Sequence, residues 1–160
     1  MSTDIRGFAL DLPLPGMAAT EALGARIAAG LRPGDAVALE GDLGAGKTAL
    51  ARVILRALGV DGPVPSPTFT LVQCYETAKI VVRHYDLYRI ERAQELDELG
   101  LDEAVNEGAA IIEWPERAGA RLPGDALHVQ LTITGESTRH ARVAGPARWA
   151  AAFSETMHAN

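Results

Sequence analysis

The chain has 160 residues, the size of one ordinary domain, and 48% of them are hydrophobic, so we expect residues 1–160 to form a single folded domain. The formal net charge of −6 excludes a broad basic surface, and direct binding to DNA or RNA is therefore not expected. The single cysteine, Cys74, excludes an internal disulfide, and no apolar run approaches the roughly 20 residues of a membrane helix. We therefore expect a cytoplasmic protein with no membrane contact.

The first predicted elements are a short strand and a helix. Residues 5–12 alternate between apolar and polar side chains, as a strand does, and Pro13 is expected to end this strand. A helix is expected over residues 21–31, with Thr20 or a residue just before it as its N-terminal cap. Its buried face is marked by apolar residues that recur every four positions, namely Leu23, Ile27 and Leu31.

A strand, a glycine-rich loop and a helix follow in immediate succession. Residues 35–42 begin with a short apolar run of period near two, which predicts a strand. Residues 47–59 carry apolar side chains at helical spacing and end in Gly59, a residue type that commonly terminates helices. The glycine-rich loop joins these two elements, and this order is the context in which a phosphate-binding loop is found.

The middle of the chain predicts a loop, a hairpin and a helical region. Residues 59–68 are rich in proline and glycine, which indicates a loop or mobile switch rather than a linker between domains. Residues 68–76 and 79–88 are two predicted strands of a β-hairpin, with Cys74 buried in the first of them. Residues 91–107 are acidic and predict helix in two short segments.

The last third of the chain predicts a buried strand, a second hairpin and a terminal helix. Residues 109–116 begin with an apolar run that ends on a carboxylate, residues 126–134 and 137–145 alternate like paired strands, and a helix is expected from about Pro146. Its buried face is expected to carry Trp149 and Phe153. The whole pattern predicts an α/β fold, a three-layer P-loop NTPase-like sandwich with a mostly parallel, partly mixed central sheet.

The glycine-rich segment matches the phosphate-loop pattern G-x-x-x-x-G-K-[ST]. Its residues, all candidate nucleotide contacts, are Gly41, Asp42, Leu43, Gly44, Ala45, Gly46, Lys47 and Thr48. Glycines let the backbone curl so that successive N–H groups point at an anion, and the following helix adds a positive dipole. The lysine, expected to face solvent, then reaches the β- and γ-phosphates, and the threonine hydroxyl binds Mg²⁺. The chain lacks the N/T-K-x-D segment that reads guanine, so the expected ligands are ATP, ADP and Mg²⁺.

Two acidic residues are candidates for the metal and for catalysis. Glu113 ends the buried apolar run, as an acid of a Walker-B strand does, and it either holds a Mg²⁺-bound water, orients the attacking water or simply faces solvent. Strand alternation places Asp86 on the same face as His84, and Asp86 is either a second Mg²⁺ ligand or a surface acid paired with an arginine. His84 is not expected to bind a metal, because no second His or Cys lies at ligand spacing.

Thr68 and Trp114 are further candidates near the nucleotide. Thr68 lies where many P-loop proteins keep a γ-phosphate sensor, and the alternative is a hydroxyl that stabilises a turn. Trp114 either lines the nucleotide site or only packs against its neighbours. A small-molecule kinase and a nucleotide switch without hydrolysis are the alternatives to an ATPase, although 160 residues leave little room for a kinase's acceptor pocket and lid.

Four short motifs occur in the order GDLGAGKT, SPTF, HYDLYR and IIEWPE. In this order and spacing they resemble the bacterial TsaE (YjeE) family, and the resemblance covers about residues 17–125. It implies a weak ATPase that supports the partner proteins TsaD and TsaB in forming N6-threonylcarbamoyladenosine at position 37 of tRNAs that read codons starting with A. It also implies that the chain relates to tRNA only indirectly, which agrees with the acidic composition.

The resemblance also implies a role for individual residues. The implied catalytic residues are Lys47, Asp86 and Glu113, and the implied Mg²⁺ ligands are Thr48, Asp86 and Glu113. The resemblance places the segment around Thr68 near the nucleotide and favours a functional role for Trp114. Ala49 stands where the family often has a second threonine, and it stays among the expected nucleotide contacts because Thr48 already occupies the Mg²⁺ position.

Overall fold

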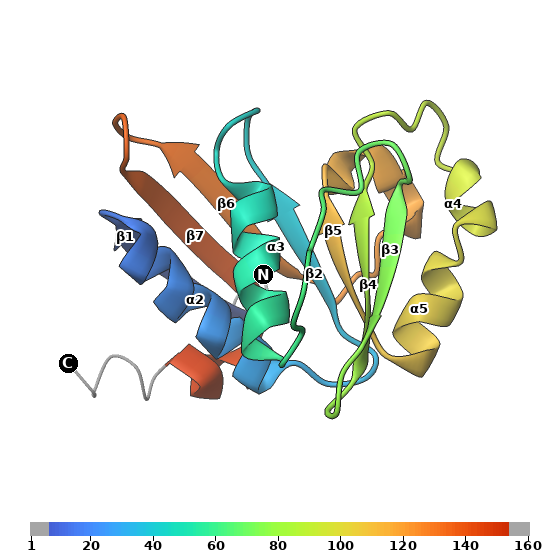
Figure 1. Cartoon of the computed structure of the whole chain (residues 1–160), viewed down its shortest axis with the longest axis horizontal. Helices are drawn as coiled ribbons and strands as arrows, with labels where there is room; N and C mark the ends of the chain where they lie inside the picture. The colour runs from blue at the N-terminus through green and yellow to red at the C-terminus, as the bar shows by residue number, and fades with distance from the viewer. Residues whose placement is uncertain (1–6, 154–160) are drawn as a thin grey trace.

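The chain forms one seven-stranded sheet flanked by helices, as the computed structural model describes it for residues 7–153 (Figure 1). The strands are β1 (Gly7–Leu14), β2 (Ala36–Glu40), β3 (Val72–Glu76), β4 (Val81–Asp86), β5 (Ala109–Glu113), β6 (Leu127–Ile133) and β7 (Arg139–Pro146). The helices are α2 (Met17–Gly30), α3 (Lys47–Ala57), α4 (Glu95–Glu98) and α5 (Leu101–Glu107), with the 3₁₀ helices η1 (Pro115–Arg121) and η2 (Ala147–Trp149). None of these helices, all within residues 7–153, combines the length and the apolar character that a membrane span requires.

The sheet has parallel strands at its centre and antiparallel pairs at its edges. Its strand order is β1-β7-β6-β2-β5-β4-β3. The four neighbours β6, β2, β5 and β4 are parallel, whereas β1 with β7, β7 with β6 and β3 with β4 are antiparallel. Consecutive strands joined by a short turn can only be antiparallel, which accounts for the hairpins β3–β4 and β6–β7, whereas the antiparallel pair of β1 and β7 joins the first and last strands of the chain. Longer crossovers connect the parallel strands of the centre. The expected α/β sandwich with a mostly parallel, partly mixed sheet is confirmed.

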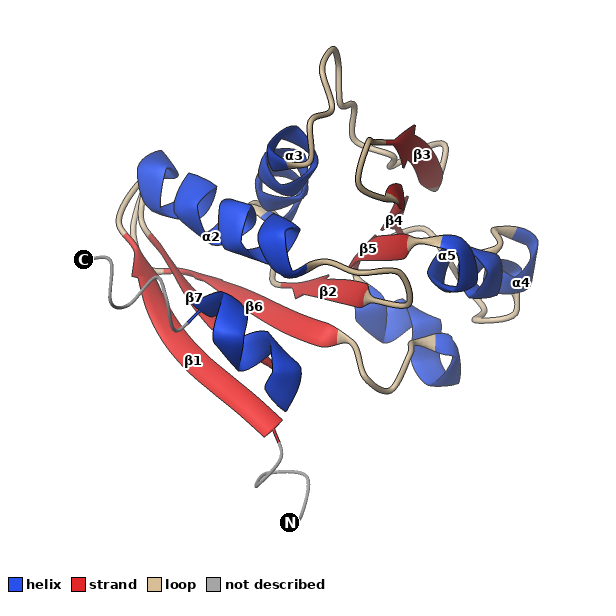
Figure 2. Ribbon diagram, turned by 90° about the horizontal axis from the view of Figure 1, so that it is seen from below, coloured by secondary structure: helices blue, strands red, loops and turns tan. Residues whose placement is uncertain are grey.

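Helices cover both faces of the sheet, and the composition of β2 shows why. Val37 and Leu39 belong to the apolar cluster that contains the buried residues of α2 and α3, and Figure 2 shows these two helices on one side of the sheet. Ala36 and Ala38 belong to a second cluster with residues of α4, α5 and η1. A strand buried on both faces must be apolar throughout, because every side chain meets a helix layer. This is the expected three-layer arrangement.

The N-terminal part differs from the prediction in two places. β1 continues through Pro13, which pairs with His140 of β7, so the prediction that Pro13 ends the strand is wrong. β1 lies at the edge of the sheet, where a position without an N–H donor can face away from the ladder. α2 starts directly after Gly16 rather than after Thr20, and no side chain caps it. Residues 5 and 6 of the predicted strand lie outside the described residues.

The predicted buried faces and both hairpins are confirmed. The expected inward residues of α2 and its C-terminal end, each at most 1% exposed, are Leu23, Ile27 and Leu31. β3 pairs with β4, and β6 pairs with β7. Trp149 and Phe153 are each 1% exposed, and the expected terminal helix begins as η2. Any part of the predicted helix after residue 153 lies outside the described residues.

The middle of the chain shows one agreement and two departures. Residues 91–107 contain two short helices, α4 and α5, separated by Gly100 in the left-handed region with φ of 70°. The first strand of the hairpin begins only after Leu71, later than predicted, because Leu71 has φ of 72° and interrupts the extended backbone. Cys74 is exposed instead of buried, because β3 is an edge strand without a helix over it at this position.

Gly108→Ala is expected to lower the free energy of unfolding by about 1–3 kcal/mol, because it overpacks the junction between α5 and β5. A Cβ at Gly108 would lie 2.0 Å from the backbone carbonyl oxygen of Val81 on β4, and backbone yields less easily than a side chain. Urea denaturation followed by circular dichroism measures the change. Gly124→Ala is the matched control, since nothing lies within 4 Å of its Cβ position. Equal denaturation midpoints for the two variants would contradict the expectation.

Candidate functional site

The glycine-rich loop connects β2 to α3, and its shape depends on its glycines. Gly41, Gly44 and Gly46 have positive φ angles of 147°, 83° and 107°. Gly41 also lies against β6, because a Cβ there would be 2.6 Å from the carbonyl oxygen of Leu131. Only glycine combines such a backbone conformation with so close an approach. The first glycine thus holds the loop against the sheet.

The helix α3 begins at the end of this loop without any side chain that satisfies its first amides. Its N-cap residue is Gly46, which makes no side-chain hydrogen bond, and its first turn contains no acidic residue. The first N–H groups of a helix have no partner within the helix, and the helix dipole places partial positive charge there. The loop and the start of α3 therefore form a site suited to an anion such as a phosphate.

Lys47 is buried, and the expectation of a solvent-facing lysine is wrong. The residue is 5% exposed, because the ring of Trp114 covers it with its centre 4.0 Å from Nζ. Nζ donates hydrogen bonds to the carbonyl oxygens of Gly41 at 2.6 Å and Asp42 at 3.0 Å. Burial lowers the pKa of Lys47, while the carboxylate of Glu113 acts in the opposite direction. A phosphate bound in the loop would stabilise the charged ammonium further.

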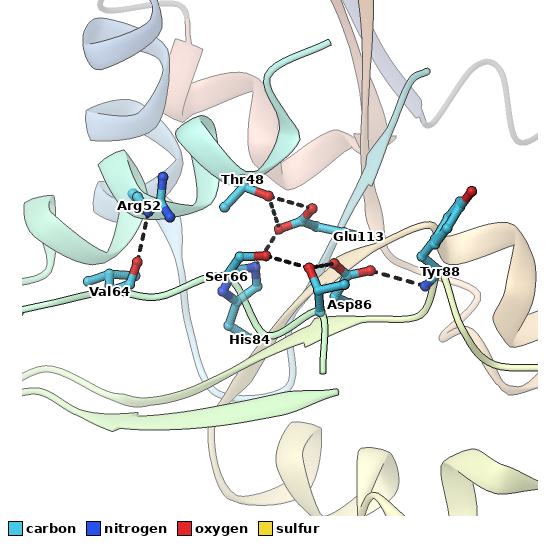
Figure 3. A network of polar contacts seen from close by, with 9 residues as sticks. Thr48, Arg52, Val64, Ser66, His84, Asp86, Tyr88 and Glu113 are labelled. Atoms are coloured by element: carbon cyan, nitrogen blue, oxygen red, sulfur yellow. Dashed lines mark hydrogen bonds and ion pairs between the residues drawn. The ribbon is translucent and has the colours of Figure 1, made fainter. Parts of the chain in front are cut away.

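Glu113 ends β5 at the centre of a buried polar cluster (Figure 3). The residue is 2% exposed, so the alternative in which it faces solvent is wrong. The hydroxyl of Thr48, from α3, donates to this carboxylate with distances of 2.9 and 3.0 Å to its two oxygens. Nε2 of His84, from β4, lies 2.7 Å from Oε2 of Glu113. When this carboxylate is ionised it can only accept, and Nε2 of His84 is then the donor in the hydrogen bond.

Asp86 lies beside Glu113, because the register of β4 and β5 makes the two residues neighbours. The hydroxyl of Thr68 donates to Oδ2 of Asp86 at 3.0 Å, and the backbone N–H of Tyr88 donates to Oδ1 at 3.0 Å. The hydroxyl of Ser66 lies 2.7 Å from that of Thr68. Asp86 is 5% exposed, so the alternative of a surface acid is wrong. The two acids thus sit side by side at the carboxyl ends of parallel strands, where α/β proteins bind ligands.

Trp114 both packs against its neighbours and faces the site. It has φ of 60°, a conformation that bulky side chains rarely adopt, and this turn directs the chain out of β5. Its ring lies against that of Tyr88 with a centroid distance of 4.9 Å, and it covers Lys47. Backbone conformations of this kind cluster at functional sites.

A cavity of about 400 Å³ brings most of the predicted site residues together. The predicted residues that line it are Leu43, Gly44, Gly46, Lys47, Thr48, Ala49, Thr68, Asp86, Glu113 and Trp114. Three predicted loop residues do not line it. Gly41 and Asp42 offer their carbonyl oxygens to Lys47, and Ala45 is buried.

Three residues of this site were not assigned from the sequence: Ser66, His84 and Tyr88. Strand alternation placed His84 on the same face as Asp86, and this pattern was the sequence signal that His84 lies near the site. The contact of His84 with a carboxylate explains a buried histidine without any metal role. Tyr88 follows the same strand alternation as His84 and Asp86, and Ser66 begins the SPTF motif, but neither signal indicated the contacts that these two residues make in the site.

The donor set suits a Mg²⁺ ion that shares its ligands with a nucleotide. Among residues 7–153, no group of three or more His, Cys, Asp or Glu side chains could hold a metal ion by itself. Mg²⁺ at nucleotide sites is typically held by one or two protein oxygens together with phosphate oxygens and water. Thr48 and Glu113 already lie in contact, and Asp86 lies next to them, so the oxygen donors fit this ion.

His84→Leu is expected to lower the free energy of unfolding by about 1–3 kcal/mol, because the buried carboxylate of Glu113 loses a hydrogen-bond donor. Urea denaturation at neutral pH measures this change. His128→Leu is the matched control, because His128 also pairs with a glutamate, Glu40, at 2.8 Å, but its side chain is 41% exposed. Exposed pairs contribute at most about 1 kcal/mol. A loss in His84→Leu no larger than that in the control would contradict the expectation.

The mixed sheet, the glycine loop between β2 and α3 and the acids at the ends of β4 and β5 define an α/β protein with a P-loop NTPase-like sandwich fold. The chain belongs to the TsaE family. The family described as "Threonylcarbamoyl adenosine biosynthesis protein TsaE" matches residues 14–142, so the resemblance drawn from the four motifs is confirmed.

Relatives named "tRNA threonylcarbamoyladenosine biosynthesis protein TsaE" are similar over most of the chain. The relative from Rickettsia felis is 40% identical over 121 residues, which are 75% of this chain and 71% of the relative. The relative from Bacillus subtilis is 37% identical over 121 residues, 75% of each chain, and that from Mycobacterium tuberculosis is 38% identical over 133 residues, 78% and 79% of the two chains. The crystal structure of Bacillus subtilis YdiB has a TM-score of 0.79 at 29% identity, covering 96% of this chain and 98% of that one.

Proposed function

We propose that this chain binds and hydrolyses Mg²⁺–ATP, and that this ATPase cycle supports the formation of N6-threonylcarbamoyladenosine in tRNA together with TsaB and TsaD. The observation that carries the ATPase proposal is the contact of Thr48 with Glu113, because it brings a hydroxyl and a carboxylate together at the end of a phosphate loop. The biosynthetic role is taken from the names of the family and of its similar members.

The proposed chemistry is phosphoryl transfer to water, assisted by the two acids. The amides of the loop and Lys47 hold the phosphates, and a bound Mg²⁺ would neutralise charge on the phosphate oxygens. Glu113 is the acid nearest to Thr48, and we therefore assign it to the metal or its water shell and to orienting the attacking water. Asp86, bonded to Thr68, is the second acid and links the metal side of the site to the loop that would meet the γ-phosphate.

A protein partner is supported by the surface around the cavity. Leu43, which lines the cavity, is 67% exposed, and Phe69, the neighbour of Thr68, is 80% exposed. Large exposed apolar side chains on and near the loops of the site are surface that another protein can cover. The net charge of −6 favours an indirect relation to tRNA through TsaB and TsaD, and the single cysteine fits a cytoplasmic location.

The test is phosphate release from Mg²⁺–ATP and Mg²⁺–GTP, measured with and without purified TsaB and TsaD. Turnover specific for ATP that is slow alone and rises on adding the partners would support the proposal. An unchanged rate with partners would contradict the partnership. If a small metabolite instead accelerates loss of the γ-phosphate and becomes phosphorylated, the protein is a kinase and the ATPase proposal fails.

A further inference from the structure

Arg139 connects the C-terminal hairpin to the phosphate loop, although no motif includes it. It is the first residue of β7, and its guanidinium reaches across to the loop. Nε donates to the carbonyl oxygen of Ala45 at 3.2 Å, and Nη2 donates to that of Gly44 at 3.1 Å. Nη1 donates to the carbonyl oxygens of Gly135 at 3.1 Å and Thr138 at 2.8 Å, which anchors the guanidinium to its own hairpin.

The hydrogen bonds from Arg139 to the loop carbonyls also fix the direction in which the neighbouring N–H groups of the loop point. In a trans peptide the C=O and the next N–H point in opposite directions, and the described chain has no cis peptide bond. Drawing the carbonyl of Ala45 toward Arg139 therefore turns the N–H of Gly46 away from it. Gly46 lines both the cavity that holds Lys47 and Thr48 and the pocket beside Arg139, and an amide directed away from Arg139 is available to an anion in that cavity.

The charge of Arg139 is not neutralised by the groups that it contacts. All four of its acceptors are backbone carbonyl oxygens. Among residues 7–153, none of the ion pairs involves Arg139, whereas Arg142 on the same strand pairs with Asp11 at 2.9 Å. A half-buried guanidinium without a carboxylate partner, next to a loop built for anions, adds positive potential where phosphates would bind.

We propose that Arg139 is a positioning residue of the nucleotide site, which holds the phosphate loop in its anion-binding shape from the C-terminal hairpin. The inference rests on the proposed binding of a nucleotide. The hairpin of β6 and β7 carries none of the recognised motifs. Through Arg139 it would nevertheless contribute to nucleotide binding. Lysine cannot replace this arginine fully, because a single ammonium cannot reach carbonyls of the loop and of the hairpin with the same planar fork.

The test compares Arg139→Gln and Arg139→Lys with Arg142→Gln, which removes an arginine of the same strand far from the loop contacts. Isothermal titration with Mg²⁺–ADP is expected to show a dissociation constant about tenfold or more higher in Arg139→Gln, a smaller increase in Arg139→Lys and none in Arg142→Gln. A second measurement is hydrogen exchange of the nucleotide-free proteins. The amides of residues 44–47 should exchange faster in Arg139→Gln, with the amides of β2 and β5 unchanged.

The outcomes separate this inference from the proposed function. Wild-type protein that binds Mg²⁺–ADP, together with unchanged affinity in Arg139→Gln, would overturn the role of Arg139 and leave the proposed function standing. Wild-type protein that fails to bind would overturn both. Weaker binding with unchanged exchange of residues 44–47 would mean that Arg139 acts only by its charge and does not position the loop. If Arg139→Gln does not fold, the titration and the hydrogen exchange of Arg139→Lys test the proposed role of Arg139 instead.

Discussion

Lys47→Ala is expected to weaken Mg²⁺–ATP binding by about a hundredfold or more, because each charged hydrogen bond to a phosphate contributes about 1.5–3 kcal/mol and every 1.4 kcal/mol is a factor of ten. In the described state Nζ is held by the carbonyl oxygens of Gly41 and Asp42 beneath Trp114. The ammonium thus lies inside the loop, where a phosphate would be bound. Isothermal titration with a non-hydrolysable ATP analogue measures the effect.

Lys79→Ala is the matched control for this variant. Lys79 also donates to two backbone carbonyls, those of Ala28 at 2.8 Å and Ala29 at 3.0 Å, but it does so at the end of α2. Its removal should leave nucleotide affinity unchanged. Affinity in Lys47→Ala within about threefold of the wild type, a difference below 1 kcal/mol, would refute the phosphate-loop assignment.

Glu113→Gln is expected to retain ATP binding and to lower its turnover by about a hundredfold or more, the range typical for loss of a general base. Glutamine keeps the size of the side chain and an oxygen that accepts from Thr48 and His84, but it cannot take a proton from water. The variant should therefore accumulate bound ATP. Single-turnover hydrolysis, with the nucleotide recovered from the protein and separated into ATP and ADP, measures both quantities.

Glu116→Gln is the control for this second variant, since Glu116 is a neighbouring carboxylate that does not line the cavity of Lys47 and Thr48. Its hydrolysis rate should stay within about twofold of the wild type, as expected when no catalytic proton transfer is lost. A similar rate in Glu113→Gln would show that Glu113 serves only as a structural acceptor. Hydrolysis would then depend on another group, with Asp86 as the candidate catalytic acid.

Local sequence patterns predicted the elements that depend on neighbours along the chain. The buried face of α2, the two hairpins and the order strand, glycine loop, helix were all visible, because side-chain periodicity and glycine content act over a few residues. The predictions were wrong where the structure of a segment depends on residues far along the chain. Pro13 is accepted within β1 and Cys74 is exposed on β3 because both strands lie at edges of the sheet, and edge position is a property of the whole sheet.

Contiguous motifs were sufficient to recognise the TsaE family and to predict a phosphate loop and two site acids. How these residues meet depends on contacts between distant parts of the chain. Thr48 and Glu113 are 65 residues apart and touch only because β5 lies beside β2, and His84 reaches Glu113 only because the register of β4 and β5 brings them together. The contact of Arg139 with Gly44 spans 95 residues. Strand order and register arise from burial of both faces of the sheet, which no short segment encodes.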